Sequence, residues 1–244
     1  MWEDQFKNHL ESQVAKCFNH FQSSKAKYMT IWDYYNINMP ECINECSEVA
    51  KRYAEKPDRD GPQGIYWIGE NPEIFFIGRD HYGWYGDANW PIDIDCICFS
   101  PLQFSYYTIE SMGTYWGIIK DIVEESFKDR KYSWDEKLQR VAFSNACKCL
   151  SGNSSYQWNL HANCLKHQYL AREIKTVNAK LNVLFTKSYK LLDKLFESQC
   201  EVLYDGEEFS ARKHDHQIII ECAHPGRQSH EWRNRLKDTI KKFI

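Results

Sequence analysis

Ile74-Phe75-Phe76-Ile77 is the first of four short runs in this 244-residue chain that consist almost entirely of apolar residues. The other three are Val141-Ala142-Phe143-Ser144, Val183-Leu184-Phe185 and Ile218-Ile219-Ile220. Such runs are typical of strands that are buried on both faces of a parallel sheet. Helical patterns separate the runs, and they lie around Gly117 to Phe127, Cys164 to Lys180, Tyr189 to Phe196 and Trp232 to Phe243. This alternation predicts an α/β fold, a three-layer α/β/α sandwich with a mainly parallel four-stranded central sheet.

The segment before the first run has a different character. Apolar residues recur there at four-residue steps, at Trp2, Phe6, Leu10 and Val14, which is the stripe of an amphipathic helix. Residues 55–64 follow as a connector rich in charges, Pro and Gly. We therefore predict a single domain over 1–244, with a helical N-terminal extension over 1–60 and an α/β core over 65–244.

Composition and charge narrow the class of protein. Hydrophobic residues make up 43% and charged residues 27% of the chain, and no apolar run approaches the ~20 residues that a membrane-spanning helix needs. The first eight residues lack the order of a signal peptide, so we expect a soluble, cytoplasmic protein. The net charge of −3 argues against a general coating of nucleic acid. Positive charge nevertheless gathers near the C-terminus, at Arg227, Arg233, Arg235, Lys237, Lys241 and Lys242.

Chemically useful side chains follow three of the four predicted strands. Asp80 lies in a glycine-bounded turn after the first, Asn145 ends the second, and His224 follows the fourth. Ligands of parallel sheets bind beyond the carboxyl ends of the strands, so a carboxylate, an amide and an imidazole are expected at one edge. Each residue also has a structural interpretation, because Asp favours turns, Asn ties down backbone groups and His-Pro is common in loops.

These residues resemble the three signature motifs of the uracil-DNA glycosylase superfamily, in order. The motifs are Gly78-Arg79-Asp80-His81-Tyr82, then Asn145 after a strand, then His224-Pro225-Gly226-Arg227-Gln228-Ser229. The segment Cys96 to Ser100 also resembles the family's stretch with a base-stacking phenylalanine, here Phe99. The resemblance covers residues 65–244. The segment Ile68 to Gly78, which leads into the first motif, is most similar to that of the iron-sulfur branches. The resemblance therefore implies a uracil-DNA glycosylase-like sandwich.

The resemblance also implies roles for the site residues. Asp80 and His224 would be catalytic, and Asn145, Tyr82, Phe99 and Gly78 would bind the base. Asp80 would stabilise the oxocarbenium-like sugar, while His224 would donate a hydrogen bond to the departing base. Arg227, Gln228 and Ser229 would contact DNA, together with the basic C-terminal segment.

Four of the ten cysteines match the positions of cluster ligands in the iron-sulfur branches. They are Cys42, Cys46, Cys149 and Cys164, and the resemblance implies that they hold a [4Fe–4S] cluster. The first pair has the spacing Cys-x-x-x-Cys, whereas the family usually has Cys-x-x-Cys. Zinc is the alternative metal for four thiolates, and buried packing is the interpretation without a metal.

The function implied is that of a DNA glycosylase, a hydrolase of base excision repair. It would flip uracil or a related modified base out of DNA and hydrolyse its N-glycosidic bond. We expect a monomer that acts on DNA in the cytoplasm, associated with the nucleoid, with no membrane partner. The alternatives are a glycosylase directed at modified phage DNA, a non-catalytic nucleic-acid-binding module on the same fold, and an unrelated α/β enzyme with similar strand ends.

Three departures from the motifs bear on the substrate. His81 replaces the usual proline, Arg79 stands where the iron-sulfur branches have a glutamate, and residues 84–95 form an insertion. These departures favour a roomier pocket, suited to an oxidised or hypermodified pyrimidine.

Overall fold

The computed structural model describes residues 67–68, 71–79, 81–82, 113–146, 150–151, 168–187, 190–196, 200–225 and 228–243. The predicted N-terminal extension over 1–60 lies outside these residues. Within them, no helix has both the length and the apolar character needed to cross a bilayer.

The described part of the chain is built around one seven-stranded sheet, in the order β1-β4-β2-β6-β9-β8-β7. Its four central strands are parallel: β4 (Val141–Asn145), β2 (Ile74–Gly78), β6 (Leu181–Leu184) and β9 (Gln217–Cys222). They correspond to the four apolar runs. All residues of β2, β4 and β6 are buried, because helices cover both faces of the sheet.

Antiparallel strands extend this parallel centre on both sides, so the sheet is mixed. β1 (Trp67–Ile68) pairs with β4, and β8 (Phe209–His214) pairs with β9 and with β7 (Glu201–Asp205). A separate parallel pair joins β3 (His81–Tyr82) to β5 (Leu150–Ser151). The α/β class is therefore confirmed, whereas the predicted four-stranded sheet is only the centre of a wider one.

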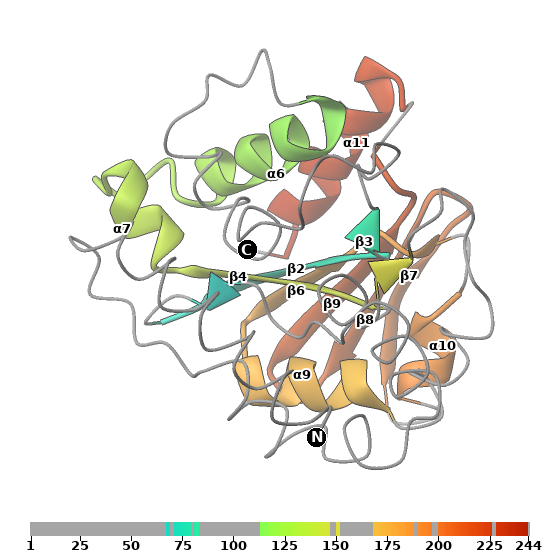
Figure 1. Ribbon diagram of the computed structural model, residues 1–244. Helices are drawn as coiled ribbons and strands as arrows, with labels where there is room; N and C mark the ends of the chain where they lie inside the picture. The colour runs from blue at the N-terminus through green and yellow to red at the C-terminus, as the bar shows by residue number, and fades with distance from the viewer. Residues whose placement is uncertain are drawn as a thin grey trace.

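Helices lie on both faces of the sheet (Figure 1). One face carries α6 (Gly113–Ser126) beside α11 (His230–Lys241), and the other carries α9 (Tyr169–Val177) and α10 (Leu192–Leu195). The short α7 (Trp134–Leu138) leads from α6 into β4. The helical patterns thus produce α6, α9, α10 and α11, while α7 is too short to reveal a period in the sequence.

The core follows from the alternation of side chains along each strand. Phe76 and Phe143 stack at 5.5 Å between ring centroids and lie in the cluster that includes Ile118, Ile122 and Leu236 of α6 and α11. Phe75 is fully buried but lies outside this cluster, since its side chain points to the opposite face of β2. The helices on the two faces therefore enclose the sheet between two apolar layers.

Candidate functional site

The carboxyl ends of the four parallel strands meet at one edge of the sheet. Gly78 of β2 is the register partner of Asn145 of β4, and Leu184 of β6 is aligned with Ile77 on one side and Glu221 on the other. Hydrogen bonds continue past the strand ends, from Ala146 N to Gly78 O at 2.9 Å and from Phe185 N to Ile77 O at 2.9 Å. The residues that follow these strands therefore share one edge.

The strand order marks a particular point on this edge. The chain passes from β2 to β4 on one side, then crosses back to β6 on the other side and continues to β9. The connections leave β2 and β6 in opposite directions, and such a switch point opens a crevice at the carboxyl ends of α/β sheets. Arg79, which follows β2, and Phe185 and Thr186, which follow β6, flank that position.

Asn145 ends β4 next to this switch point. It is buried, and it follows Val141 and Phe143 on the face of the sheet that α6 covers. Gly78, its register partner, has no side chain that would occupy the space beside the carboxamide. Two of the four predicted base-binding residues are thus brought together, and a carboxamide carries both a hydrogen-bond donor and an acceptor.

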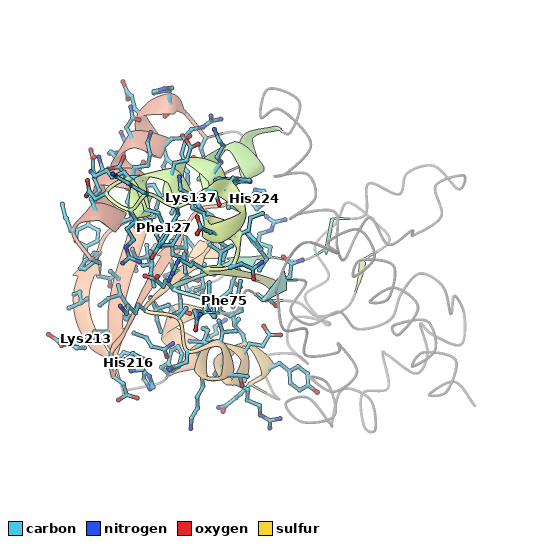
Figure 2. All side chains as sticks on the ribbon, turned by 90° about the vertical axis from the view of Figure 1, so that its left-hand side faces the viewer. Phe75, Phe127, Lys137, Lys213, His216 and His224 are labelled. Carbon is cyan, nitrogen blue, oxygen red and sulfur yellow. The ribbon has the colours of Figure 1, made fainter. Side chains whose placement is uncertain are left out.

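His224 lies two residues beyond β9, at the other side of the switch point. Figure 2 shows His224 at one end of the sheet and His216, in the turn that leads into β9, at the other end. Burial lowers the pKa of the His224 imidazole, and the charge of Arg79 lowers it further, to about 4. The imidazole is therefore neutral near pH 7, with one ring N–H donor and one ring nitrogen acceptor.

Two of the predicted DNA-contacting residues have structural contacts in the loop after His224. Gln228 Nε2 donates to the His224 backbone oxygen at 3.2 Å, and Gln228 N donates to Pro225 O at 3.3 Å. Ser229 is the N-cap of α11, where its Oγ accepts a hydrogen bond from Trp232 N at 3.2 Å. Gln228 therefore holds the loop that carries the imidazole, and Ser229 caps the helix that follows it. Neither structural role was predicted from the sequence.

Most cations on α11 are engaged in ion pairs with acidic groups of neighbouring elements. Arg235 makes a bidentate pair with Glu208 at 2.9 and 2.7 Å, Lys237 lies 3.6 Å from Asp121, and Lys241 lies 3.3 Å from Glu125. Any phosphate contacts by these three side chains would compete with the ion pairs. The predicted basic C-terminal face is thus partly neutralised within the chain.

Several predicted site residues lie outside the described part of the chain. They are Asp80, Phe99, Arg227 and the four predicted metal ligands, Cys42, Cys46, Cys149 and Cys164. Tyr82 is described only as part of β3, whose pairing with β5 sets the first motif beside the segment after Asn145. Among the residues that are described, no group of three or more His, Cys, Asp or Glu side chains could hold a metal ion.

Two buried carboxylates near the site were not predicted. Glu173 of α9 accepts a hydrogen bond from Ser144 Oγ at 2.8 Å, and Glu221 of β9 accepts one from Thr186 Oγ1 at 2.7 Å and one from Leu191 N at 2.8 Å. Burial raises the pKa of Glu221 despite these hydrogen bonds. The sequence contains one signal that could have revealed Glu221, because this glutamate directly follows the apolar run Ile218 to Ile220.

The arrangement combines a neutral imidazole, a carboxamide and a guanidinium around one switch point. Together they can hydrogen-bond a planar polar ligand and stabilise negative charge on it. Neither a protein-family model nor a curated protein matches the chain.

Proposed function

We propose that the protein is a DNA glycosylase with a uracil-DNA glycosylase-like sandwich fold, which removes uracil or a related modified base from DNA. The observation that carries the proposal is the convergence of Gly78, Asn145 and His224, which are far apart in the sequence, at the carboxyl ends of the parallel strands in the centre of the sheet. The neutral state of His224 supports the same function, because an uncharged imidazole can donate a hydrogen bond to a departing base.

The proposed reaction assigns one task to each group. Asn145 reads the donor and acceptor pattern of the flipped base, and Phe99 stacks on the base. Asp80 stabilises the oxocarbenium-like sugar and positions the attacking water. His224 donates to the carbonyl oxygen of the base as negative charge develops there. Tyr82 limits the space around the pyrimidine ring, and the Arg227 to Ser229 loop enters the minor groove.

The four cysteines are proposed to hold a [4Fe–4S] cluster that ties Cys42 and Cys46 to Cys149 and Cys164. No step of the proposed reaction passes through this cluster. Its task would be to join the N-terminal segment to the sheet.

The test is release of free base from single- and double-stranded oligonucleotides that contain uracil, hypoxanthine, xanthine or hydroxymethyluracil. We expect the wild-type protein, purified without oxygen, to release at least one of these bases. Asp80→Ala and His224→Ala should each lower the rate by about 10²–10³-fold, because each removes charge stabilisation in the transition state.

Matched controls exist within the described residues. His216→Ala removes an exposed histidine at the opposite end of β9, and Asp129→Ala removes an exposed carboxylate in the turn after α6. Both controls should retain the wild-type rate. Base release that survives both Asp80→Ala and His224→Ala would refute the assigned mechanism, and DNA binding without release of any base would favour a binding module.

A further inference from the structure

A row of aligned residues crosses the sheet where β6 and β9 end. Glu221 of β9 is the register partner of Leu184 on one side and of Ser210 on the other. Ser210, near the start of β8, is in turn aligned with Asp205, the last residue of β7. Lys187 lies three residues beyond Leu184. The strand order therefore brings a lysine, a serine and an aspartate from three segments to the edge of the sheet that carries the candidate site.

These three side chains meet, together with Arg212 of β8, in what we call the Ser210 cluster. Lys187 Nζ donates a hydrogen bond to Ser210 Oγ, and Ser210 Oγ donates one to Asp205 Oδ1 at 2.6 Å. Lys187 Nζ also lies 3.7 Å from Asp205 Oδ1, and Arg212 Nη2 lies 3.5 Å from Asp205 Oδ2. One carboxylate thus faces a hydroxyl and two cations.

Burial distinguishes the two cations from the carboxylate that faces them. The side chains of Lys187 and Arg212 are 18% and 11% exposed, whereas the side chain of Asp205 is 59% exposed. Largely buried cations need an anion beside them, because they have lost most of their water. An exposed carboxylate is a weak partner, since water and salt screen its charge. Asp205 is therefore the member of the Ser210 cluster that an anion from solution can replace.

The distances within the cluster favour an anion with more oxygen atoms than a carboxylate. The two ion pairs of Asp205, at 3.7 and 3.5 Å, are longer than the about 2.7–3.2 Å of an N–H···O hydrogen bond. A phosphate group is tetrahedral, and its charged oxygens can accept hydrogen bonds from a lysine, an arginine and a hydroxyl together. The donor set of the Ser210 cluster therefore suits a phosphate better than it suits the planar group of Asp205.

Glu221 is a further charged group beside the cluster. Its carboxylate accepts hydrogen bonds from Thr186 Oγ1 at 2.7 Å and from Leu191 N at 2.8 Å, and the positive charge of Lys187 acts on it as well. When Glu221 is ionised, it offsets one of the two cations. Replacement of Asp205 by a phosphate exchanges one anion for another, so this balance with Glu221 does not oppose the exchange.

Two other charged side chains next to the cluster have partners of their own. Arg212 Nη1 donates to the backbone oxygen of Tyr204 at 3.1 Å, which ties this arginine to β7. Glu208, in the turn between β7 and β8, makes a bidentate ion pair with Arg235 of α11. The hydrogen bond from Ser210 lowers the pKa of Asp205, and the charges of Arg212 and Lys187 lower it further, so Asp205 is ionised at pH 7.

We propose that Lys187, Ser210 and Arg212 form a binding site for a phosphate group, and that Asp205 is an internal competitor that occupies this site until phosphate displaces it. The inference goes beyond the proposed glycosylase function, because these four residues are separate from those assigned to the base, the sugar and the metal. Free phosphate and the phosphodiester of a nucleic-acid backbone share the required chemistry, and separate ligands distinguish them.

The first test is isothermal titration calorimetry of the full chain with inorganic phosphate. Asp205→Asn retains the size of the side chain and removes its charge, so it should raise the affinity by about two- to fivefold, the range for one exposed charge. Ser210→Ala and Lys187→Gln should each lower the affinity by about tenfold, because each removes a hydrogen bond to a charged group. The gain in Asp205→Asn is decisive, since loss of the fold cannot produce it.

Two matched controls lie at the other end of β8. Asp215→Asn removes a carboxylate whose side chain is 81% exposed, and Lys213→Gln removes an exposed lysine (Figure 2). Both controls should bind phosphate as the wild type does. Thermal unfolding without phosphate checks that each variant is folded.

The second test repeats the titrations with an undamaged single-stranded oligonucleotide that has no terminal phosphate. A gain in affinity of Asp205→Asn for this strand assigns the site to backbone phosphates, and a gain for inorganic phosphate alone assigns it to free phosphate. Unchanged affinity for both ligands, or an equal gain in Asp215→Asn, overturns the inference. Neither titration involves base release, so the phosphate site and the proposed glycosylase function succeed or fail separately.

Discussion

Glu173 and Glu221 support the candidate site from the face of the sheet opposite to Asn145. Glu173 binds Ser144, the neighbour of Asn145, and Glu221 binds Thr186, which follows β6 at the switch point. A buried carboxylate is costly unless it accepts hydrogen bonds, so each of these contacts fixes a strand end. The two glutamates therefore hold the backbone from which the site residues project.

A third carboxylate, Glu73, lies at the opposite edge of the sheet, where β2 begins. Arg130 Nη1 donates to its two carboxylate oxygens at 2.7 and 2.8 Å, and Arg140 Nη1 donates at 2.7 Å. The Arg140 guanidinium also stacks 4.2 Å from the centroid of the Tyr132 ring. Burial alone would raise the pKa of Glu73, but the hydrogen bonds and charges of the two arginines lower it below the ordinary value of 4.5.

The residue-scale prediction concerns Glu73→Gln. We expect it to lower the free energy of unfolding at pH 7 by about 1–2 kcal/mol, because hydrogen bonds to a charged group are lost. A carboxyl whose pKa is depressed by folding stabilises the protein above its unfolded pKa, and this contribution is lost as the pH falls through the folded value. The difference between wild type and variant in urea unfolding should therefore shrink below about pH 4.5. A difference that stays constant down to pH 2 would contradict the assignment, while base release at pH 7 should be unchanged.

At the scale of elements, the strands divide into those that a sequence pattern can reveal and those that it cannot. β2, β4, β6 and β9 were predicted because strands buried on both faces are apolar at nearly every position. β7 is mostly exposed, with Val202 at 60% and Tyr204 at 50% exposure, and its residues show no buried alternation. β8 ends in Arg212, Lys213 and His214, so the sequence contains no apolar run from which its pairing with β9 could be predicted. Such strands are specified by their partners rather than by their own composition.

The helices show the same division. In α6, buried residues recur at Ile118, Ile119, Ile122 and Val123, so the helical period is visible in the sequence. The cap at Ser229 was not predicted as a structural feature, because the motif resemblance assigned this residue to DNA. Ser229 can both cap α11 and contact DNA, and suitable substitutions can test the two roles separately.

The element-scale prediction is that Ser229→Ala lowers the free energy of unfolding by about 1 kcal/mol, since the Trp232 N–H loses its acceptor at the start of α11. Ser229→Asp should retain the cap and the stability, but it should weaken DNA binding if the hydroxyl faces a phosphate. Urea unfolding and DNA affinity, measured on both variants, distinguish the two roles. Equal stability of Ser229→Ala and the wild type would show that the cap contributes nothing.

At the scale of the whole molecule, the sequence identified the strand ends but not which of them become neighbours. Asn145 and His224 were expected at one edge because parallel strands end on the same side. The interaction of Arg79 with His224 could not be anticipated, since it depends on β6 being the single strand that separates β2 from β9 in the sheet order. Strand order is a property of the crossover connections, and no residue pattern within a strand encodes it.

The whole-molecule prediction concerns the four cysteines. Protein purified without oxygen should contain about four iron atoms and four acid-labile sulfides per chain, as a [4Fe–4S] cluster requires. Cys149→Ser and Cys164→Ser should each lower the iron content, and Cys200→Ser, a substitution at a partly buried cysteine in the loop before β7, should not. Stoichiometric zinc without iron would support the alternative metal and contradict the cluster.

The position of β2 between β4 and β6 has a consequence for synthesis. Both neighbours of β2 follow it in the chain, and the second of them is complete only at Leu184. At roughly 5–20 residues per second, the fully buried segment Ile74–Gly78 leaves the ribosome several seconds before β6 exists to cover its second edge. During that interval the nascent chain exposes an apolar segment that can associate with other chains. We therefore expect its dependence on chaperones to be greatest while the residues from β2 to β6 are being synthesised.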